Sequence, residues 1–182
     1  MAKASGDFYD SDGVAIASSC RAFVGLGSNL ADPKNQVRNA LNALRGIPNT
    51  HLHAHSSLYS STPMGPADQP DFVNAAAELF TGLAPLALLD HLQAIEMAQG
   101  RVRVAQRWGP RAIDLDLLLF DELEIDVPRL KLPHAGAVER DFVLVPLAEL
   151  DSTVFIPGHG TVATCLSQLQ DSPLYVMGRD NS

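Results

Sequence analysis

The order of the apolar patterns constrains the fold of this chain more than any other sequence feature. Short apolar or alternating segments bounded by turn residues predict strands over 22–30, 51–61, 72–80 and 113–120. Helical patterns lie between the first and second of these strands and between the third and fourth. The resulting order, β-α-β-β-α-β, is ferredoxin-like. It predicts an α+β fold with a mainly antiparallel sheet and helices packed on it.

The helices also carry signals at their ends. The first is predicted to begin at Pro33, behind the capping residue Asp32, and to end before Gly46. Its inner face carries apolar residues at helical spacing: Val37, Ala40, Leu41 and Leu44. The second helix is predicted over 85–99 and is followed by a glycine. Residues 141–150 are expected to begin extended and to end in a helical turn.

Length and composition favour one domain in a reducing compartment. The 182 residues suffice for one core, so we expect a single domain over 21–182 behind a disordered leader, residues 1–20. The two cysteines form no disulfide framework or zinc motif, and no apolar run reaches the ~20 residues of a membrane span. We therefore expect a cytoplasmic protein. Its net charge of −8 argues against a broad nucleic-acid or anionic-membrane surface and leaves room for a local site that binds a small anion.

Two aspartates interrupt the apolar segment 113–120. On a strand, Asp114 and Asp116 point to one face and Leu115 to the other. On a helix the two carboxylates would diverge by about 200°. Two carboxylates on one strand face suit Mg²⁺ that is shared with a polyphosphate. The alternative is a solvated edge strand whose outer face happens to be acidic.

Arginines crowd the segment before these aspartates, which is expected to form a long mobile loop over 101–112. Four of them fall within eleven residues: Arg101, Arg103, Arg107 and Arg111. A guanidinium bonds two phosphate oxygens at once, so arginines beside a carboxylate pair suit phosphoryl transfer. The alternatives are a solvated basic loop and an RNA contact. Trp108 lies among the arginines and is expected to cover a ligand as part of a closing lid.

Two further features leave alternatives open. Glu96 is predicted near the C-terminal end of the second helix, where a negative charge opposes the helix dipole. With Gln93 on the same face, it either pairs with an arginine or lines a nucleotide site. His51, His53 and His55 are predicted on one strand face. A solvated face is favoured there over a zinc site, because one strand cannot readily wrap three ligands around one ion.

Four sequence blocks resemble those of one enzyme family in order and spacing. They are GLGSNL at 25–30, DQPDFVNAA at 68–76, RWGPRAIDLDLLLF at 107–120 and LPHAGAVERDFVLVPLAEL at 132–150. Over about residues 22–157 the chain is similar to the folate-pathway pyrophosphokinases, which act on 6-hydroxymethyl-7,8-dihydropterin. The resemblance implies that the hydroxymethyl oxygen of the pterin attacks the β-phosphorus of ATP and that AMP leaves. The implied partners are these two small molecules, with no nucleic acid and no membrane, and the protein is expected to be a monomer.

The resemblance also implies roles for particular residues around ATP. Asp114 and Asp116 would bridge two Mg²⁺ ions to the substrates, and Arg101 and Arg111 would stabilise the transferring group. The positions matched around ATP itself are Gln93, Glu96, Arg103, Trp108, Leu117, Arg129, Lys131, His134 and Arg140. No protein nucleophile is implied, so catalysis would consist of positioning and charge neutralisation.

The pterin would stack between two aromatic rings. The matched positions are Phe72 and Phe142, and Asn74 would read the polar edge of the heterocycle. Backbone of the preceding loop would help, at Ser61, Thr62 and Met64. The sequence departs from the family at Phe72, where a tyrosine is often found, and at Ala135, where a larger residue is common. At Phe72 the stacking is kept but a hydroxyl is lost. The departure at Ala135 concerns the packing on the adenine side and not the chemistry.

Two rival functions remain open at this point. Nucleotidyltransferases also hold two Mg²⁺ ions on paired aspartates, but their Gly-Ser pair precedes the aspartates by about a dozen residues. Here Ser28 precedes Asp114 by 86 positions. Such an enzyme would release pyrophosphate instead of AMP. The second rival is a catalytically dead nucleotide-binding module, against which the intact aspartates and arginines speak.

Overall fold

The computed structural model describes Tyr9, Gly13 and residues 19–63, 69–100, 111–169 and 175–178. The first seven elements are β1 (Cys20–Ser28), α1 (Pro33–Leu44), β2 (Thr50–His55), β3 (Leu58–Ser61), β4 (Phe72–Thr81), α2 (Pro85–Ala98) and β5 (Asp114–Phe120). They are followed by β6 (Ile125–Val127), β7 (Leu130–Leu132), α3 (Asp141–Asp151), β8 (Phe155–Ile156), β9 (Gly160–Thr161), α4 (Val162–Gln168) and β10 (Tyr175–Gly178). β1 thus begins at the last residue that we assigned to the leader, most of which lies outside the described residues.

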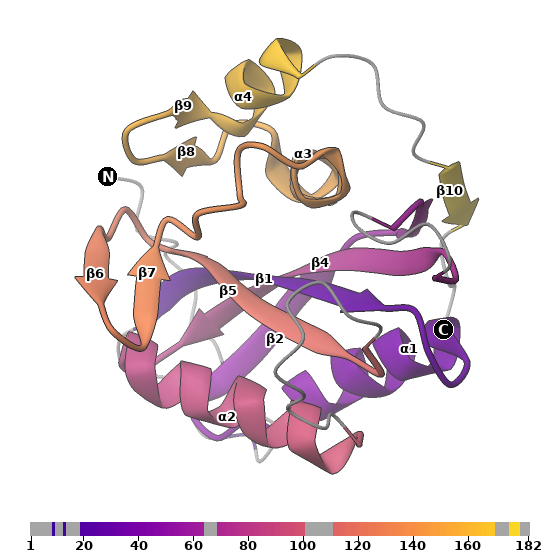
Figure 1. Cartoon of the computed structure of the whole chain (residues 1–182). Coiled ribbons are helices and arrows are strands. Elements are labelled where there is room, and N and C mark those ends of the chain that lie inside the picture. Colours follow the sequence, from indigo (N-terminus) through magenta and orange to yellow (C-terminus); the bar gives the residue numbers. More distant parts are fainter. Residues whose placement is uncertain are drawn as a thin grey trace.

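One antiparallel sheet organises these elements (Figure 1). Its strand order is β10-β3-β4-β1-β5, and β2 also pairs with β4. The pairs within this sheet are antiparallel. The β6–β7 and β8–β9 pairs form two separate hairpins. The order β5-β1-β4 followed by β2 or β3 is the ferredoxin-like arrangement, so the predicted α+β fold is confirmed.

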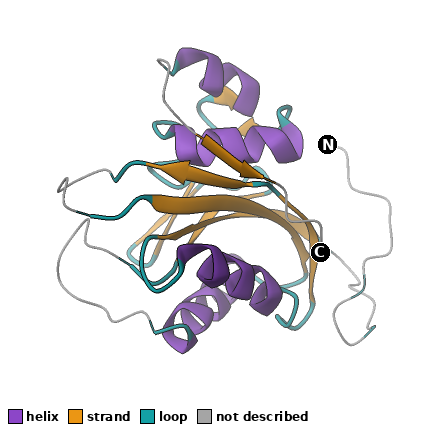
Figure 2. Cartoon of the chain, turned by 90° about the vertical axis from the view of Figure 1, so that its right-hand side faces the viewer, coloured by secondary structure: helices purple, strands orange, loops and turns teal. Residues whose placement is uncertain are grey.

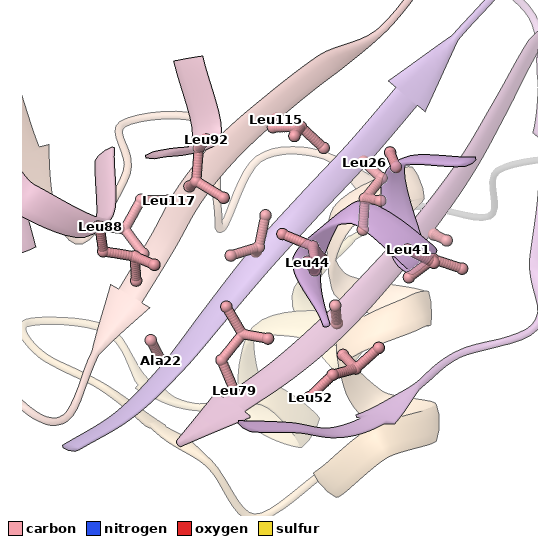
Figure 3. Packing of buried hydrophobic residues seen from close by; sticks show 14 of the residues in the cluster. Ala22, Leu26, Leu41, Leu44, Leu52, Leu79, Leu88, Leu92, Leu115 and Leu117 are labelled. Atoms are coloured by element: carbon pink, nitrogen blue, oxygen red, sulfur yellow. The ribbon is translucent and has the colours of Figure 1, made fainter. Parts of the chain in front are cut away.

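Helices cover both faces of the sheet (Figures 1 and 2). α1 and α2 pack on one face, while α3 covers the other and α4 packs on α3. Figure 3 shows the larger apolar cluster, in which leucines of both helices meet leucines of the strands: Leu41, Leu44, Leu88, Leu92, Leu26, Leu79 and Leu117. A second cluster joins α3 to the opposite face of the same strands. Because both faces are covered, β4 is buried along most of its length.

The predicted features of α1 are confirmed. The carboxylate of Asp32 accepts a hydrogen bond from the backbone of Asn35 at 3.5 Å, and Pro33 is the first helical residue. The four apolar residues predicted on the inner face are the buried residues of the helix: Val37, Ala40, Leu41 and Leu44. Local signals suffice here because the cap, the proline and the apolar stripe all agree.

The segment 51–61 is two strands instead of the one predicted. Ser56 and Ser57 separate β2 from β3, and both serines are buried. The pairing of β2 with β4 also shifts between Leu52 and Ala54, so that His55 lies opposite Ala77. His51 lies opposite Phe80, on the other face of β4. The prediction that the three histidines share one face is therefore wrong, because the bulge moves the last of them to the opposite face.

Residues 141–150 are helical from their start, which corrects the expectation of an extended beginning. α3 tolerates Pro146 in its interior, although proline removes one helical hydrogen bond. Leu144 and Leu147 are fully buried against the sheet. The packing of these two leucines, which local propensity does not include, explains why the helix forms.

Candidate active site

A pocket with a volume of about 550 Å³ opens between the sheet and the N-terminal end of α3. β1, β4 and β5 supply its floor, and α3 with the segment before it supplies one wall. Several residues that the sequence placed in the site line it: Ser61, Thr62, Phe72, Asn74, Arg111, Asp114, Asp116, His134, Arg140 and Phe142. The sheet register explains how residues far apart in the sequence meet there.

The floor of the pocket consists of two cross-strand rows. In one row Gly27 of β1 lies between Asn74 of β4 and Asp114 of β5. In the next row Gly25 lies between Ala76 and Asp116. Neighbouring strands are about 4.8 Å apart, so the backbones of Asn74 and Asp114 lie about 10 Å apart on opposite sides of a glycine, and both side chains line the pocket.

Gly25 and Gly27 leave this part of the pocket floor without side chains. A Cβ atom added at Gly25 would lie 3.3 Å from Leu118 Cδ1, and one added at Gly27 would lie 3.4 Å from Asn74 Oδ1. Any larger side chain would project into the pocket. The sequence-based prediction did not include this role, although glycine at alternate positions of a strand is itself a signal for close approach of a ligand.

The two aspartates share one face of β5, as predicted. Their side chains are 17% exposed for Asp114 and 41% exposed for Asp116, and both line the pocket. Leu115 lies on the other face, in the cluster with α1 and α2. The guanidinium of Arg111 forms an ion pair with Asp114. The prediction that the carboxylates form a pair on one strand face is therefore confirmed.

His134 faces the same carboxylates. Its Nε2 atom lies 3.9 Å from Oδ1 of Asp116. The backbone amide of Gly136 donates a hydrogen bond to Nδ1 of His134 at 3.2 Å, so Nδ1 acts as an acceptor. In the neutral ring the proton then resides on Nε2, which can donate into the pocket.

The end of the pocket that β4 and the start of α3 form is aromatic. Phe72 of β4 and Phe142 of α3 both line it, and the guanidinium of Arg140 lies 5.8 Å from the centre of the Phe142 ring. The side-chain amide of Asn74 donates to Oγ of Ser61 at 2.8 Å. This bond fixes the orientation of the buried amide and leaves its oxygen directed away from Ser61. The pocket thus combines an aromatic end with an end that carries carboxylates.

Comparisons with known proteins agree with this geometry. The profile of the family described as 7,8-dihydro-6-hydroxymethylpterin-pyrophosphokinase (HPPK) matches residues 23–152. The chain belongs to this family. The Pseudomonas aeruginosa 2-amino-4-hydroxy-6-hydroxymethyldihydropteridine pyrophosphokinase is 58% identical over 75% of this chain and 84% of its own length. The Haemophilus influenzae enzyme of the same name is 47% identical over 82% of this chain and 93% of its own length.

Solved structures show the same fold. A crystal structure of Plasmodium falciparum HPPK-DHPS, wild type with pteroate, matches with a TM-score of 0.66 and 14% identity. The match covers 83% of this chain and 42% of that chain, so this pyrophosphokinase spans less than half of the HPPK-DHPS protein. At this identity the likeness concerns the fold alone.

Some residues that the family resemblance placed around ATP lie outside the described pocket. Glu96 is buried in α2, and its Oε1 accepts a hydrogen bond from the backbone of Leu115 at 2.7 Å, which ties α2 to β5. Leu117 is 2% exposed and packs in the cluster with α1 and α2. If Leu117 contacts a nucleotide, it does so through its backbone, because β5 is an edge strand of the main sheet.

The remaining matched positions are exposed, half-buried or outside the described residues. Arg129 of the β6–β7 connection forms an ion pair with Asp90 of α2, and both side chains are more than half exposed. Lys131 is exposed, with its Nζ 3.4 Å from Asp126. Gln93 is half-buried on α2. The predicted site residues outside the described part of the chain are Met64, Arg101, Arg103 and Trp108. Among the described helices, none is long and apolar enough to cross a membrane.

Proposed function

We propose that this pyrophosphokinase transfers pyrophosphate from ATP to the hydroxymethyl group of 6-hydroxymethyl-7,8-dihydropterin, releasing AMP, in folate biosynthesis, and that it does so in the pocket under α3. Family membership supports the reaction. The observation that supports the location is the row Asn74–Gly27–Asp114. In this row Gly27 separates two polar side chains. The amide of Asn74 can hydrogen-bond the edge of a heterocycle, and the carboxylate of Asp114 can bind a metal ion.

The aromatic end of the pocket suits the pterin. A flat heterocycle with amide-like edges can stack between Phe72 and Phe142 while Asn74 hydrogen-bonds its polar edge. The glycines beneath leave the height that such a ring needs. The hydroxymethyl group would then point along the floor toward the carboxylates of β5.

The carboxylate end fits Mg²⁺, and we propose that two ions bind there. Asp114 and Asp116 present hard oxygen ligands on one face, and both carboxylates are partly exposed to the pocket. Among the described residues, no group of three or more His, Cys, Asp and Glu side chains is placed to hold a metal ion. Phosphate oxygens and water would therefore complete the coordination. When bound, the ions would neutralise phosphate charge and orient the phosphates.

Basic and donor groups of the chain would hold the phosphates on the remaining sides. Arg111 and Arg140 line the pocket, and Nε2 of His134 can donate to a phosphate oxygen. The family resemblance assigns Arg101 to the transferring group and places Arg103 around ATP, and both would add to these contacts. The hydroxymethyl oxygen attacks the β-phosphorus, the bond to the oxygen that leads to the α-phosphate breaks, and the hydroxyl proton is lost to solvent. No side chain forms a covalent bond in this scheme.

Sequence spacing alone does not exclude the nucleotidyltransferase rival. Gly27 is directly opposite Asp114 in the sheet, so the long separation in the sequence does not keep the Gly-Ser pair away from the aspartates. Family membership favours release of AMP over release of pyrophosphate. We also propose that the protein works as a cytoplasmic monomer, with ATP and the pterin as its partners.

A product assay tests the proposed function. The protein is incubated with ATP, MgCl₂ and 6-hydroxymethyl-7,8-dihydropterin, and AMP, ADP and pyrophosphate are separated. We expect one AMP for each pyrophosphorylated pterin, and no turnover when EDTA removes the metal. ADP would indicate transfer of a single phosphoryl group, pyrophosphate would favour a nucleotidyltransferase, and bound but unconverted ATP would favour the binding module.

A further inference from the structure

Glu149 of α3 joins this helix to the start of β3. Its carboxylate accepts three hydrogen bonds: from the backbone amide of Ser57 at 2.8 Å, from the hydroxyl of Ser57 at 2.9 Å and from the hydroxyl of Tyr59 at 2.8 Å. Ser57 and Tyr59 are each 6% exposed. Hydrogen bonds to a charged acceptor in such a place are stronger than those between neutral groups.

β3 leads from this contact to the polar edge of the pocket. Tyr59 lies opposite Asn74 in the sheet, and Ser61 at the end of β3 accepts the hydrogen bond from the Asn74 amide. The break between β2 and β3 is held by Ser56, whose hydroxyl accepts from the backbone of Ala76 at 2.9 Å. Pairing with β4 holds β3 along its length, and Ser56 and Glu149 fix where the strand begins after this break. A displacement of β3 would move Ser61, whose hydroxyl orients the side-chain amide of Asn74.

α3 leads from the same contact to the aromatic wall. Phe142 and Glu149 are seven residues apart, which places both on one face of the helix about 10 Å from each other. Phe142 lines the pocket, whereas Glu149 contacts the sheet. The contact of Glu149, together with the buried Leu144 and Leu147 between the two residues, therefore helps to set how closely Phe142 approaches the sheet.

A second contact holds the end of α3 at a different strand. Asp151 accepts from Arg21 of β1 at 3.0 Å, and Arg21 also donates to the buried Glu78 at 2.6 Å. This cluster lies away from β3 and from Asn74. Asp151 is therefore a useful comparison for Glu149. Both acidic residues bind α3 to the sheet, but only Glu149 also binds β3, the strand whose Ser61 orients the side-chain amide of Asn74.

We propose that Glu149 is a positioning residue for the pterin: through α3 and β3 it fixes the spacing between Phe142 and the Ser61–Asn74 pair. The inference rests on the proposed function, because it assumes that the pterin binds between these groups. It assigns Glu149 no contact with either substrate. Replacing it should thus weaken pterin binding while leaving ATP binding nearly unchanged.

The first variant is Glu149→Gln, which keeps the shape of the side chain but replaces one acceptor oxygen with a donor and removes the charge that strengthens the three hydrogen bonds. Binding of 6-hydroxymethyl-7,8-dihydropterin is measured by calorimetry with α,β-methylene-ATP and MgCl₂ present, and binding of the nucleotide is measured separately. We expect the pterin Kd and KM to rise about tenfold, and the nucleotide Kd to stay within about twofold. Glu122→Gln, an exposed residue in the turn after β5, is the matched control and should change neither constant.

A milder variant keeps the test valid if Glu149→Gln is poorly folded. Tyr59→Phe removes one of the donors and leaves both bonds of Ser57, so we expect a roughly two- to threefold rise in the pterin Kd. When Tyr59→Phe is combined with Glu149→Ala, its own effect should vanish, because the truncated side chain leaves the hydroxyl without its acceptor. Full additivity of the two effects would contradict the inference.

The outcomes separate this inference from the proposed function. A wild-type protein that binds no pterin would refute the proposed pocket itself. Pterin binding by the wild type that survives unchanged in Glu149→Gln and Tyr59→Phe, with only a lower melting temperature, would show that Glu149 stabilises the fold and positions nothing. A parallel rise in the pterin and nucleotide Kd values would also overturn the inference, since it would indicate general loosening of the site.

Discussion

Gly27 of β1 lies directly opposite Asp114 of β5, and its other neighbour in the sheet is Asn74 of β4. Strand pairing thus brings the first and third sequence blocks of the family into contact, although 86 residues separate Ser28 from Asp114. In the proposed function the amide of Asn74 binds the pterin and the carboxylate of Asp114 binds Mg²⁺. The glycine between them forms the surface on which the substrate would rest.

Gly27→Leu is expected to block the pocket without disrupting the sheet. The added side chain would start 3.4 Å from Asn74 Oδ1 and extend over the floor, so the pterin Kd should rise by at least roughly tenfold. Calorimetric titration with the pterin measures this change. Gly46→Leu, at an exposed position after α1, is the control and should bind normally. Unchanged pterin affinity in Gly27→Leu would place the pterin elsewhere.

Asp114→Ala and Asp116→Ala should each lower kcat by about a thousandfold or more, because the metal would lose a ligand. Circular dichroism should show an unchanged fold, since both side chains face the pocket and not the core. Binding of Mn²⁺ with ATP, followed by electron paramagnetic resonance, gives a readout that is independent of turnover. Asp126→Asn, whose side chain is 80% exposed, serves as control. Nearly normal activity in both alanine variants would contradict the two-metal assignment.

Arg101→Ala should lower kcat much more than it weakens ATP binding, if this arginine acts mainly in the transition state. The family resemblance is the basis of this expectation. Steady-state kinetics and the Kd of a non-hydrolysable ATP analogue measure the two quantities. Equal losses in kcat and in ground-state affinity would instead assign Arg101 the role of a simple anchor.

Asp151→Asn should reduce stability in a pH-dependent way. Burial raises the pKa of Asp151, but hydrogen bonds from the hydroxyl and backbone of Thr153 and from Arg21 outweigh it and hold that pKa below its ordinary value. A lowered pKa means that the carboxylate stabilises the fold above the unfolded pKa and loses this effect as the pH falls through the folded pKa.

We therefore expect the variant to melt roughly 1–3 °C below the wild type at pH 7, because a partly exposed ion pair contributes little. The difference should begin to shrink below about pH 4, the ordinary pKa of an aspartate, and should disappear as the pH falls through the lowered pKa of Asp151 in the folded protein. Thermal unfolding followed by circular dichroism between pH 3 and 8 measures it. A difference that stays constant over this range would contradict an electrostatic origin.

Local signals predicted the parts of the fold in which they agree with the packing. Asp32, Pro33 and the four inner residues of α1 specify that helix within a few turns of chain. The alternation of Asp114, Leu115 and Asp116 likewise predicted which face each side chain occupies, because strand geometry leaves only two choices.

Contacts across the sequence explain where local reasoning failed. The break at Ser56 and Ser57 is stabilised by Ala76 and Glu149, neither of which is near in the sequence. The helical start of α3 depends on leucines that pack against distant strands. The role of Gly25 and Gly27 was missed because a glycine carries no chemistry of its own, and their alternation on the strand gains a specific meaning once the register places them between the site residues.

The floor formed by these two glycines has a consequence for inhibitors that would occupy the pterin end. Resistance often arises when a mutation shortens a side chain and removes a contact that the inhibitor uses. Glycine has no side chain to shorten, so substitution at either position can only raise the floor. A compound that rests on β1 would therefore meet a surface that substitution can only raise, and we expect a raised floor to weaken binding of the pterin as well.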